Sequence, residues 1–90
     1  MITEFAKRTG IPELEILGTS RARRITDARH VYRYILYLNG YSHSEIGRLC
    51  GCHHSTVTNG IKRAKGLIEA KDKAIMQLYN LTKDIKKKYL

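Results

Sequence analysis

The sequence lacks the features that mark membrane, secreted and nucleotide-binding proteins. No apolar run approaches the ~18 residues that would suggest a membrane span, and the N-terminal stretch has no apolar signal-peptide core. The motif G-x-x-x-x-G-K-[ST], which cradles nucleotide phosphates, is missing. We therefore expect a cytoplasmic protein with no membrane partner, no nucleotide and no cofactor.

Catalytic and metal-binding patterns are also scarce. The eight carboxylates are scattered, without a D-x-D or H-E-x-x-H pattern, so we expect a protein that is not an enzyme. Cys50, Cys52, His53 and His54 are crowded together with no second cluster. Structural zinc takes ligand pairs that lie apart in sequence, so we expect no metal. The two cysteines are expected to stay reduced and to pack as small apolar groups.

Acidic residues are few, and the excess of positive charge is uneven. Seventeen Lys and Arg side chains stand against eight Asp and Glu, a net charge of +9. Residues 1–20 carry two basic and three acidic side chains, whereas residues 21–90 carry 15 and five. Such a basic domain attracts polyanions such as DNA through counterion release. Charge alone also fits a merely solvated surface, so the assignment depends on the helical pattern.

The apolar pattern indicates an all-α domain of about five to six helices that covers residues 1–90 as a single unit. Ninety residues suffice for one domain, and no segment alternates as a strand does. Besides a helical pair described below, we predict helices over residues 3–9, 12–17, 26–39 and 71–88. Thr26 or Asp27 is the expected cap of the third of these. Residues 19–25 are basic and aperiodic, and we predict a loop there.

Apolar spacing also predicts which faces are buried. In the helix over residues 26–39, the expected inward stripe is Ala28, Val31, Ile35 and Leu38, flanked by Tyr32 and Leu36. In the last helix it is Ile75, Leu78, Leu81, Ile85 and Tyr89. That stripe is too short to predict a coiled coil, but the helix is a candidate surface for self-association. The lysines at 86–88 are expected to fray.

The most informative segment runs from Ser42 to Val57 and predicts two helices around a tight turn. Ser42 and Glu45 form the S-x-x-E pattern of a capping box, which begins a helix. Gly51 ends that helix, because glycine enters left-handed backbone without steric cost. The expected apolar faces are Ile46, Leu49 and Cys50 in the first helix, and Val57, Ile61, Ala64 and Ile68 in the second. Gly47 is small enough for the two helices to approach closely, as in the helix-turn-helix units that read the DNA major groove.

The order of these residues along the chain also follows the pattern of a known family. Arg23 in the basic loop is followed by Asp27-Ala28-Arg29, then Ser44-Glu45-Ile46-Gly47, then the segment 51–57. This pattern resembles the C-terminal DNA-binding domain of the bacterial replication initiator DnaA over nearly the whole chain. The resemblance implies a helical domain that binds short asymmetric duplex sites, called DnaA boxes. It further implies that Arg23 enters the minor groove and that His54 and Ser55 contact bases.

Two positions and one missing module depart from the family. Cys52 stands where the family usually has arginine, and His53 where it usually has aspartate. Aspartate only accepts hydrogen bonds whereas histidine donates or accepts, so the preferred DNA sequence is left open. The family's initiators carry an ATPase module ahead of this domain. The chain is either a piece of such a protein or a relative that only binds DNA, and a transcriptional regulator or mobile-element protein is the alternative role.

The candidate DNA-binding residues form three groups. Phosphate or minor-groove contacts are expected from the basic segment, at Arg21, Arg23 and Arg24. Arg29, on the helix that follows, is expected to contact phosphate rather than bases, or to pair with an acidic side chain. Ser42 and His43 begin a helix and offer an anion site, although Ser42 serves equally well as a cap. On the recognition helix, we expect His53, His54, Ser55, Thr58 and Asn59 to face base edges or thymine methyls, and Lys62 and Arg63 to face phosphates. Thr56 points either inward or toward DNA, because its spacing fits both. The expected partner is double-stranded DNA, at the nucleoid.

Overall fold

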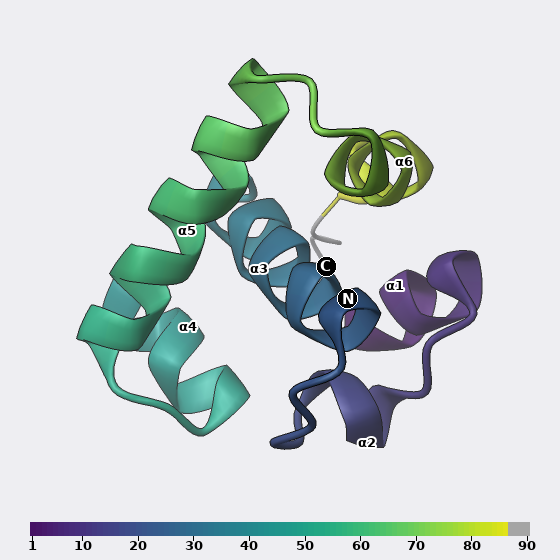
Figure 1. Ribbon diagram of the computed structural model, residues 1–90. Coiled ribbons are helices and arrows are strands. Elements are labelled where there is room, and N and C mark those ends of the chain that lie inside the picture. Colours follow the sequence, from purple (N-terminus) through teal and green to yellow (C-terminus); the bar gives the residue numbers. More distant parts are fainter. Residues whose placement is uncertain (87–90) are drawn as a thin grey trace.

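One helix, α3 (Arg23–Leu38), contacts each of the other five helices and forms the centre of the fold. The computed structural model describes residues 1–86. Figure 1 shows α4 (His43–Cys50) and α5 (His54–Glu69) on one side of α3, and α1 (Ile2–Thr9) and α2 (Glu13–Ile16) on the other. The last helix, α6 (Lys73–Thr82), is seen nearly end-on at the upper right of this view, above α1. Within residues 1–86 there are six helices and no strand, which confirms the predicted all-α class.

Because α3 is covered from several directions, it buries a wider face than the predicted stripe. Tyr32 and Leu36, expected at the flank, are buried as completely as Val31. Leu38 is 51% exposed, so its predicted inward position was wrong. Leu38 is the last residue of the helix, and the chain turns there as the Asn39 N–H bonds back to the carbonyls of Ile35 and Leu36. The central core is completed by Phe5, Ile11, Ile16, Ile46, Val57, Ile61, Ile75, Leu78 and Ile85.

The beginning of α3 also differs from the prediction, and the basic loop is correspondingly shorter. The helix begins at Arg23 rather than near Thr26, with the Thr26 N–H bonded to the Ala22 carbonyl at 2.9 Å. Asp27, expected as a cap, is 3% exposed, and its carboxylate lies 3.5 Å from the Arg23 guanidinium one turn earlier. This ion pair and the burial of Ala28 extend the helix toward its N-terminus. Arg23 and Arg24 therefore lie on the helix, and only Arg21 lies in the loop.

The predicted helix-turn-helix is confirmed in its local details. Ser42 Oγ accepts from the Glu45 N–H at 3.1 Å, and Glu45 Oε1 accepts from the Ser42 N–H at 2.9 Å, which completes the capping box. Gly51 adopts φ +68° and ends α4. Leu49, predicted to face inward, is 53% exposed. The helix packs on α3 and α5 from one side only and buries Ile46 and Gly47 there.

The C-terminal helix is shorter than predicted. It ends at Thr82, whose hydroxyl donates to the Leu78 carbonyl at 2.8 Å, and a turn then brings Ile85 into the core. Leu81, predicted to be buried, is 43% exposed, and Tyr89, Lys87 and Lys88 lie outside the described residues. Ile85 accepts a hydrogen bond from the Asn39 side chain, so this turn closes over the end of α3. Self-association through α6 stays a prediction.

The turn between α4 and α5 depends on the missing side chain of Gly47. A Cβ atom added there would lie 2.6 Å from the Cys52 carbonyl oxygen, a backbone atom that has no alternative rotamer. We expect Gly47→Ala to lower the free energy of unfolding by about 1–3 kcal/mol, through forced displacement of the turn. Urea unfolding followed by circular dichroism measures this.

The matched control is Gly66→Ala, also in a helix, where an added Cβ meets nothing within 4 Å. Alanine is the better helix former, so we expect this variant to be unchanged or up to about 1 kcal/mol more stable. Equal free energies of unfolding for the two variants would contradict the close approach at Gly47.

Candidate nucleic-acid interface

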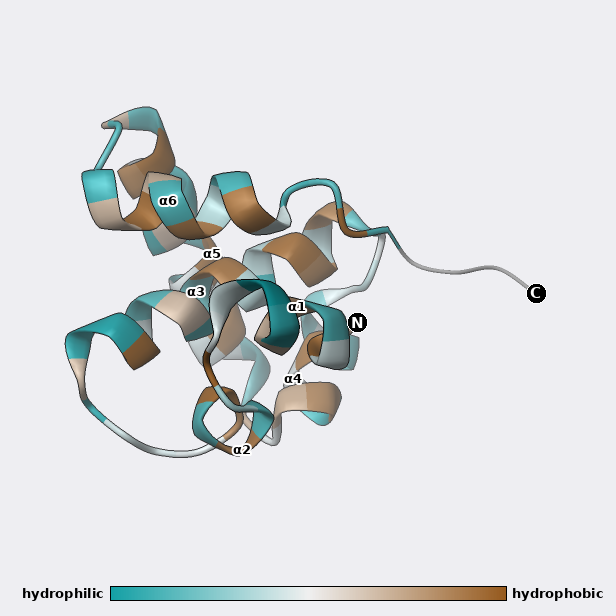
Figure 2. Ribbon diagram, turned by 90° about the vertical axis from the view of Figure 1, so that its right-hand side faces the viewer, coloured by the Kyte–Doolittle hydropathy of each residue, from teal (hydrophilic) through white to brown (hydrophobic). Residues whose placement is uncertain are grey.

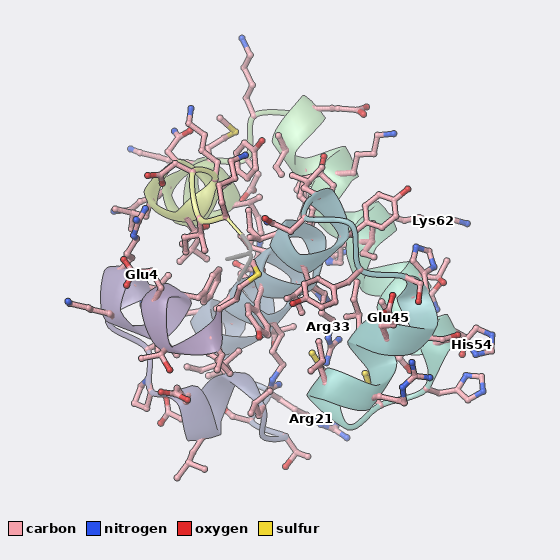
Figure 3. All side chains as sticks on the ribbon, turned by 180° about the vertical axis from the view of Figure 1, so that it is seen from behind. Glu4, Arg21, Arg33, Glu45, His54 and Lys62 are labelled. Atoms are coloured by element: carbon pink, nitrogen blue, oxygen red, sulfur yellow. The ribbon has the colours of Figure 1, made fainter. Side chains whose placement is uncertain are left out.

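The recognition helix α5 divides cleanly into a buried and an exposed face. Val57, Ile61 and Ala64 are buried as predicted, whereas Ile68 is partly exposed. The exposed residues on the other side are His54, Ser55, Thr56, Asn59, Lys62 and Arg63, and Thr58 is half-buried between the two faces. Figure 3 shows His54 and Lys62 projecting outward from this side of the molecule, with Glu4 on the opposite half. The outer face of α5 is thus polar, cationic and accessible over more than two turns.

His53 caps the recognition helix. Its Nδ1 accepts from the Ser55 N–H at 3.2 Å and lies 2.8 Å from the Ser55 hydroxyl. Its ring stacks obliquely on that of His54, with centroids 4.2 Å apart. A cap needs only an acceptor next to the first free N–H groups, and the ring nitrogen of a neutral imidazole supplies one. His53 therefore fixes the start of α5.

His43 links the two helices of the unit. Its Nδ1 lies 2.7 Å from the Thr58 hydroxyl on α5, and its ring lies 5.3 Å from that of Tyr37 on α3, centroid to centroid. Thr58 also donates to the carbonyl of His54, one turn earlier, at 3.0 Å. At the same helix start, the Ser42 hydroxyl is used by the capping box. These contacts fix α4 and α5 relative to each other on the side of the exposed face.

The three arginines predicted for the basic loop take separate places. Figure 2 shows the connection from α2 to α3 arching away from the helical body, and Arg21 is exposed in it. Arg23 is 73% exposed while tethered to Asp27. Arg24 turns toward α1 and donates to the Thr9 carbonyl at 3.0 Å. The structure therefore leaves Arg21 and Arg23 most available to a ligand.

Arg29 has an internal role that its sequence position does not reveal. Its guanidinium donates to the carbonyls of Ile16 at 3.0 Å and Glu15 at 2.8 Å, and to that of Ser20. Glu15 and Ile16 lie at the end of α2, just before the loop, and Ser20 lies within the loop. Arg29 was expected to contact phosphate or an acidic side chain, but in the structure its Nε, Nη1 and Nη2 atoms each donate to a backbone carbonyl. It anchors the loop that carries Arg21.

The crossing of α3 and α5 brings His30 and Arg33 beneath Gly60. A Cβ atom added at Gly60 would lie 3.0 Å from His30 Nδ1, which has no hydrogen-bond partner among residues 1–86. Burial lowers the pKa of His30, and the charges of Arg33 and Arg63 lower it further, against an opposing effect of Asp27. The recognition helix therefore packs over an imidazole whose neutral form is favoured by burial and by the neighbouring arginines.

The two cysteines near the turn are free thiols packed against the core. Burial raises the pKa of the Cys50 thiol, while the charge of Arg33 and a hydrogen bond from it act in the opposite direction. In the part of the chain that the structure describes, no three His, Cys, Asp or Glu side chains gather closely enough to hold a metal ion.

Arg48 is a candidate that the sequence reading missed. It is exposed on α4 and lines a hollow at the turn together with Ser44, Cys52, His53 and His54. Arg48 follows Ser44 by four residues, so both side chains lie on one face of α4. This spacing could have identified Arg48 from the sequence. Arg48 supplies a cation beside the start of α5.

The depressed pKa of His30 predicts a pH-dependent stability. The unfolded chain takes up a proton near pH 6.5, whereas folded His30 takes it up only at lower pH. The free energy of unfolding should therefore fall as pH drops below about 6.5 and level off below the folded-state pKa. Urea unfolding between about pH 7.5 and 5 measures this, and His30→Gln should flatten the dependence. The exposed-site control His54→Gln should keep it, and an unchanged slope in His30→Gln would refute the assignment.

One comparison with known proteins identifies the family of the chain. No helix within residues 1–86 has the length and apolar character required to span a membrane. No solved structure matches the chain at a significant level. Residues 1–64 match a family model described as bacterial dnaA protein helix-turn-helix, and the match extends from α1 into α5. This family is one of DNA-binding rather than catalytic domains. The chain therefore belongs to the bacterial DnaA helix-turn-helix family.

Proposed function

We propose that residues 1–90 act as one domain that binds DnaA-box-like duplex sites, in replication initiation or its regulation at the nucleoid. The observation that carries this proposal is the exposed face of α5, from His54 to Arg63, on a helix-turn-helix of the DnaA family. An exposed helix of this polarity fits the major groove, where each base pair presents a distinct set of donors and acceptors.

Base reading is assigned to the first turns of α5. His54 and Ser55 stand at the helix start, which is the part of a recognition helix that reaches base edges. Asn59 is exposed one turn further along and is suited to a bidentate contact with adenine. Val57 and Ile61 pack into the core and fix the rotation of the helix, so its backbone directs these side chains toward one side of the molecule.

Affinity and register are assigned to the cations around the helix. Lys62 and Arg63 lie further down α5 and are placed for phosphates rather than bases. Arg21 and Arg23 extend from the loop and the start of α3 toward the adjacent minor groove, where a narrow A·T-rich segment attracts arginine. Arg29 keeps the loop in place through its three carbonyl contacts.

Fluorescence anisotropy at physiological salt tests the proposed specificity. One labelled duplex carries a DnaA box and the other carries the same bases scrambled, each with competitor DNA. We expect a preference of about 10³-fold or more for the box. Equal and strongly salt-dependent binding to both duplexes would contradict box recognition, and selection from a random pool would then identify any preferred site.

Arg23 is assigned to the minor groove and Lys62 to phosphates, and a matched pair of alanine variants tests these two assignments. Arg23→Ala should lose specific affinity at the positions beside the major-groove contact, because a minor-groove arginine responds to groove shape. Lys62→Ala should weaken the box and scrambled duplexes about equally and reduce the salt slope by roughly one phosphate. Anisotropy titrations at several salt concentrations measure both effects. Equal losses for the two variants on both duplexes would overturn the assignment.

A further inference from the structure

The hydroxyl of Thr58 on the recognition helix is enclosed by two polar partners. Oγ1 lies 3.0 Å from the His54 carbonyl oxygen and 2.7 Å from His43 Nδ1. A hydroxyl has one hydrogen and accepts through its lone pairs. The bond to His54, one turn back, is the local bond that threonine commonly makes in helices, and it uses that hydrogen. His43 must then donate from Nδ1, so the hydroxyl is engaged both as donor and as acceptor.

His43 is itself held from two directions. It is the first residue of α4, whose start is fixed by the Ser42–Glu45 capping box. The ring also packs against Tyr37 on α3. Three helices thus determine where the imidazole lies, and the imidazole determines the rotamer of Thr58. Turning the Thr58 hydroxyl toward a DNA base would break two hydrogen bonds in a half-buried position.

The methyl group is the branch of Thr58 that these two hydrogen bonds leave unengaged. Threonine branches at Cβ into Oγ1 and Cγ2, and here Oγ1 faces the preceding turn of α5 and the His43 ring. Thr58 is half-buried, one turn after His54 and next to the exposed Asn59. Its position therefore adjoins the face assigned to the major groove. The apolar group that a base offers in that groove is the C5-methyl of thymine.

We propose that Thr58 selects thymine at one position of the DNA site through contact between its Cγ2 methyl and the thymine C5-methyl. His43 acts as a positioning residue that holds the Thr58 hydroxyl away from the bases. The inference rests on the proposed function, because it requires α5 to lie in the major groove. It assigns Thr58 a different chemistry from Ser55 and Asn59, whose polar groups are suited to hydrogen bonds with base edges.

Replacing thymine by deoxyuridine tests the contact directly, because it removes only the C5-methyl. The probe is the duplex bound specifically in the anisotropy assay, or the site selected from the random pool. Each thymine is replaced in turn. We expect one replacement under α5 to weaken binding by the wild-type protein by about fourfold, the effect of one buried methyl group.

Two variants of Thr58 separate its methyl from its hydroxyl. Thr58→Val keeps the methyl branch and should retain the difference between thymine and deoxyuridine at that position. Thr58→Ser keeps the hydroxyl and should lose the difference. His43→Phe removes one of the two hydrogen bonds that hold the Thr58 hydroxyl and should reduce the difference. Thr3→Ser is the control, because it removes a methyl from an exposed threonine on α1, outside the proposed DNA-binding surface, and should leave the difference unchanged. Circular dichroism and binding to scrambled DNA verify that each variant is folded.

The outcomes distinguish this inference from the function on which it rests. Specific binding without any effect of thymine replacement would overturn the methyl contact and leave DNA recognition intact. A difference that persists in Thr58→Ser and disappears in Thr58→Val would show that the hydroxyl reads the base, which also overturns it. Absence of specific binding to the box and to every selected site would refute the proposed function, and the inference with it.

Discussion

The burial of α3 is the constraint on which the rest of the molecule depends. This helix contacts the other five, and both parts of the proposed DNA-binding surface are fixed against it. Val31 and Ile35 form the core against which α5 packs through Val57 and Ile61. On another face, Arg29 holds the start of the basic loop by its backbone carbonyls. A single buried helix thus sets the geometry between the element assigned to the major groove and the loop assigned to the minor groove.

Close backbone approach then sets the geometry inside the helix-turn-helix. Gly47 admits the Cys52 carbonyl, and Gly60 admits His30 and Arg33 from α3. Neither position accommodates a Cβ atom without displacement of its neighbours, so the turn lies close against α4 at Gly47 and α3 lies close against α5 at Gly60. The capping box at Ser42 and the cap at His53 fix where each helix begins. The two caps and the two close contacts place polar side chains such as His54 and Ser55 on a helix that is packed against the core.

Local signals in the sequence predicted the helix-turn-helix correctly, because each of its parts depends on neighbouring residues. The capping box, the left-handed Gly51 and the apolar stripe of α5 follow from spacing alone. The errors arose where tertiary contacts decide the outcome. Asp27 pairs with Arg23 and is buried instead of capping α3, and Leu49 and Leu81 lie on helix faces that the other elements of residues 1–86 leave partly open.

The role of Arg29 was hidden for a related reason. Its partners are backbone carbonyls of residues 15, 16 and 20, and the sequence gives no sign of where those carbonyls point. A basic residue near a basic loop therefore looks like a phosphate contact. The hydrogen bond from His43 to Thr58 likewise could not be predicted from the sequence, because it joins residues on two helices whose relative rotation depends on the core. Side-chain chemistry was readable from the sequence, but the partners of each polar group were not.

The central claim is that DNA docks on the exposed face of α5 together with the loop before α3. Amide chemical-shift mapping of the ¹⁵N-labelled protein, with and without a specifically bound duplex, tests it most directly. The account predicts the largest shifts at the start of α5, the N-terminus of α4 and residues 19–23, with small shifts along α1 and α6. Shifts concentrated on α1 and α6, with α5 unaffected, would contradict it.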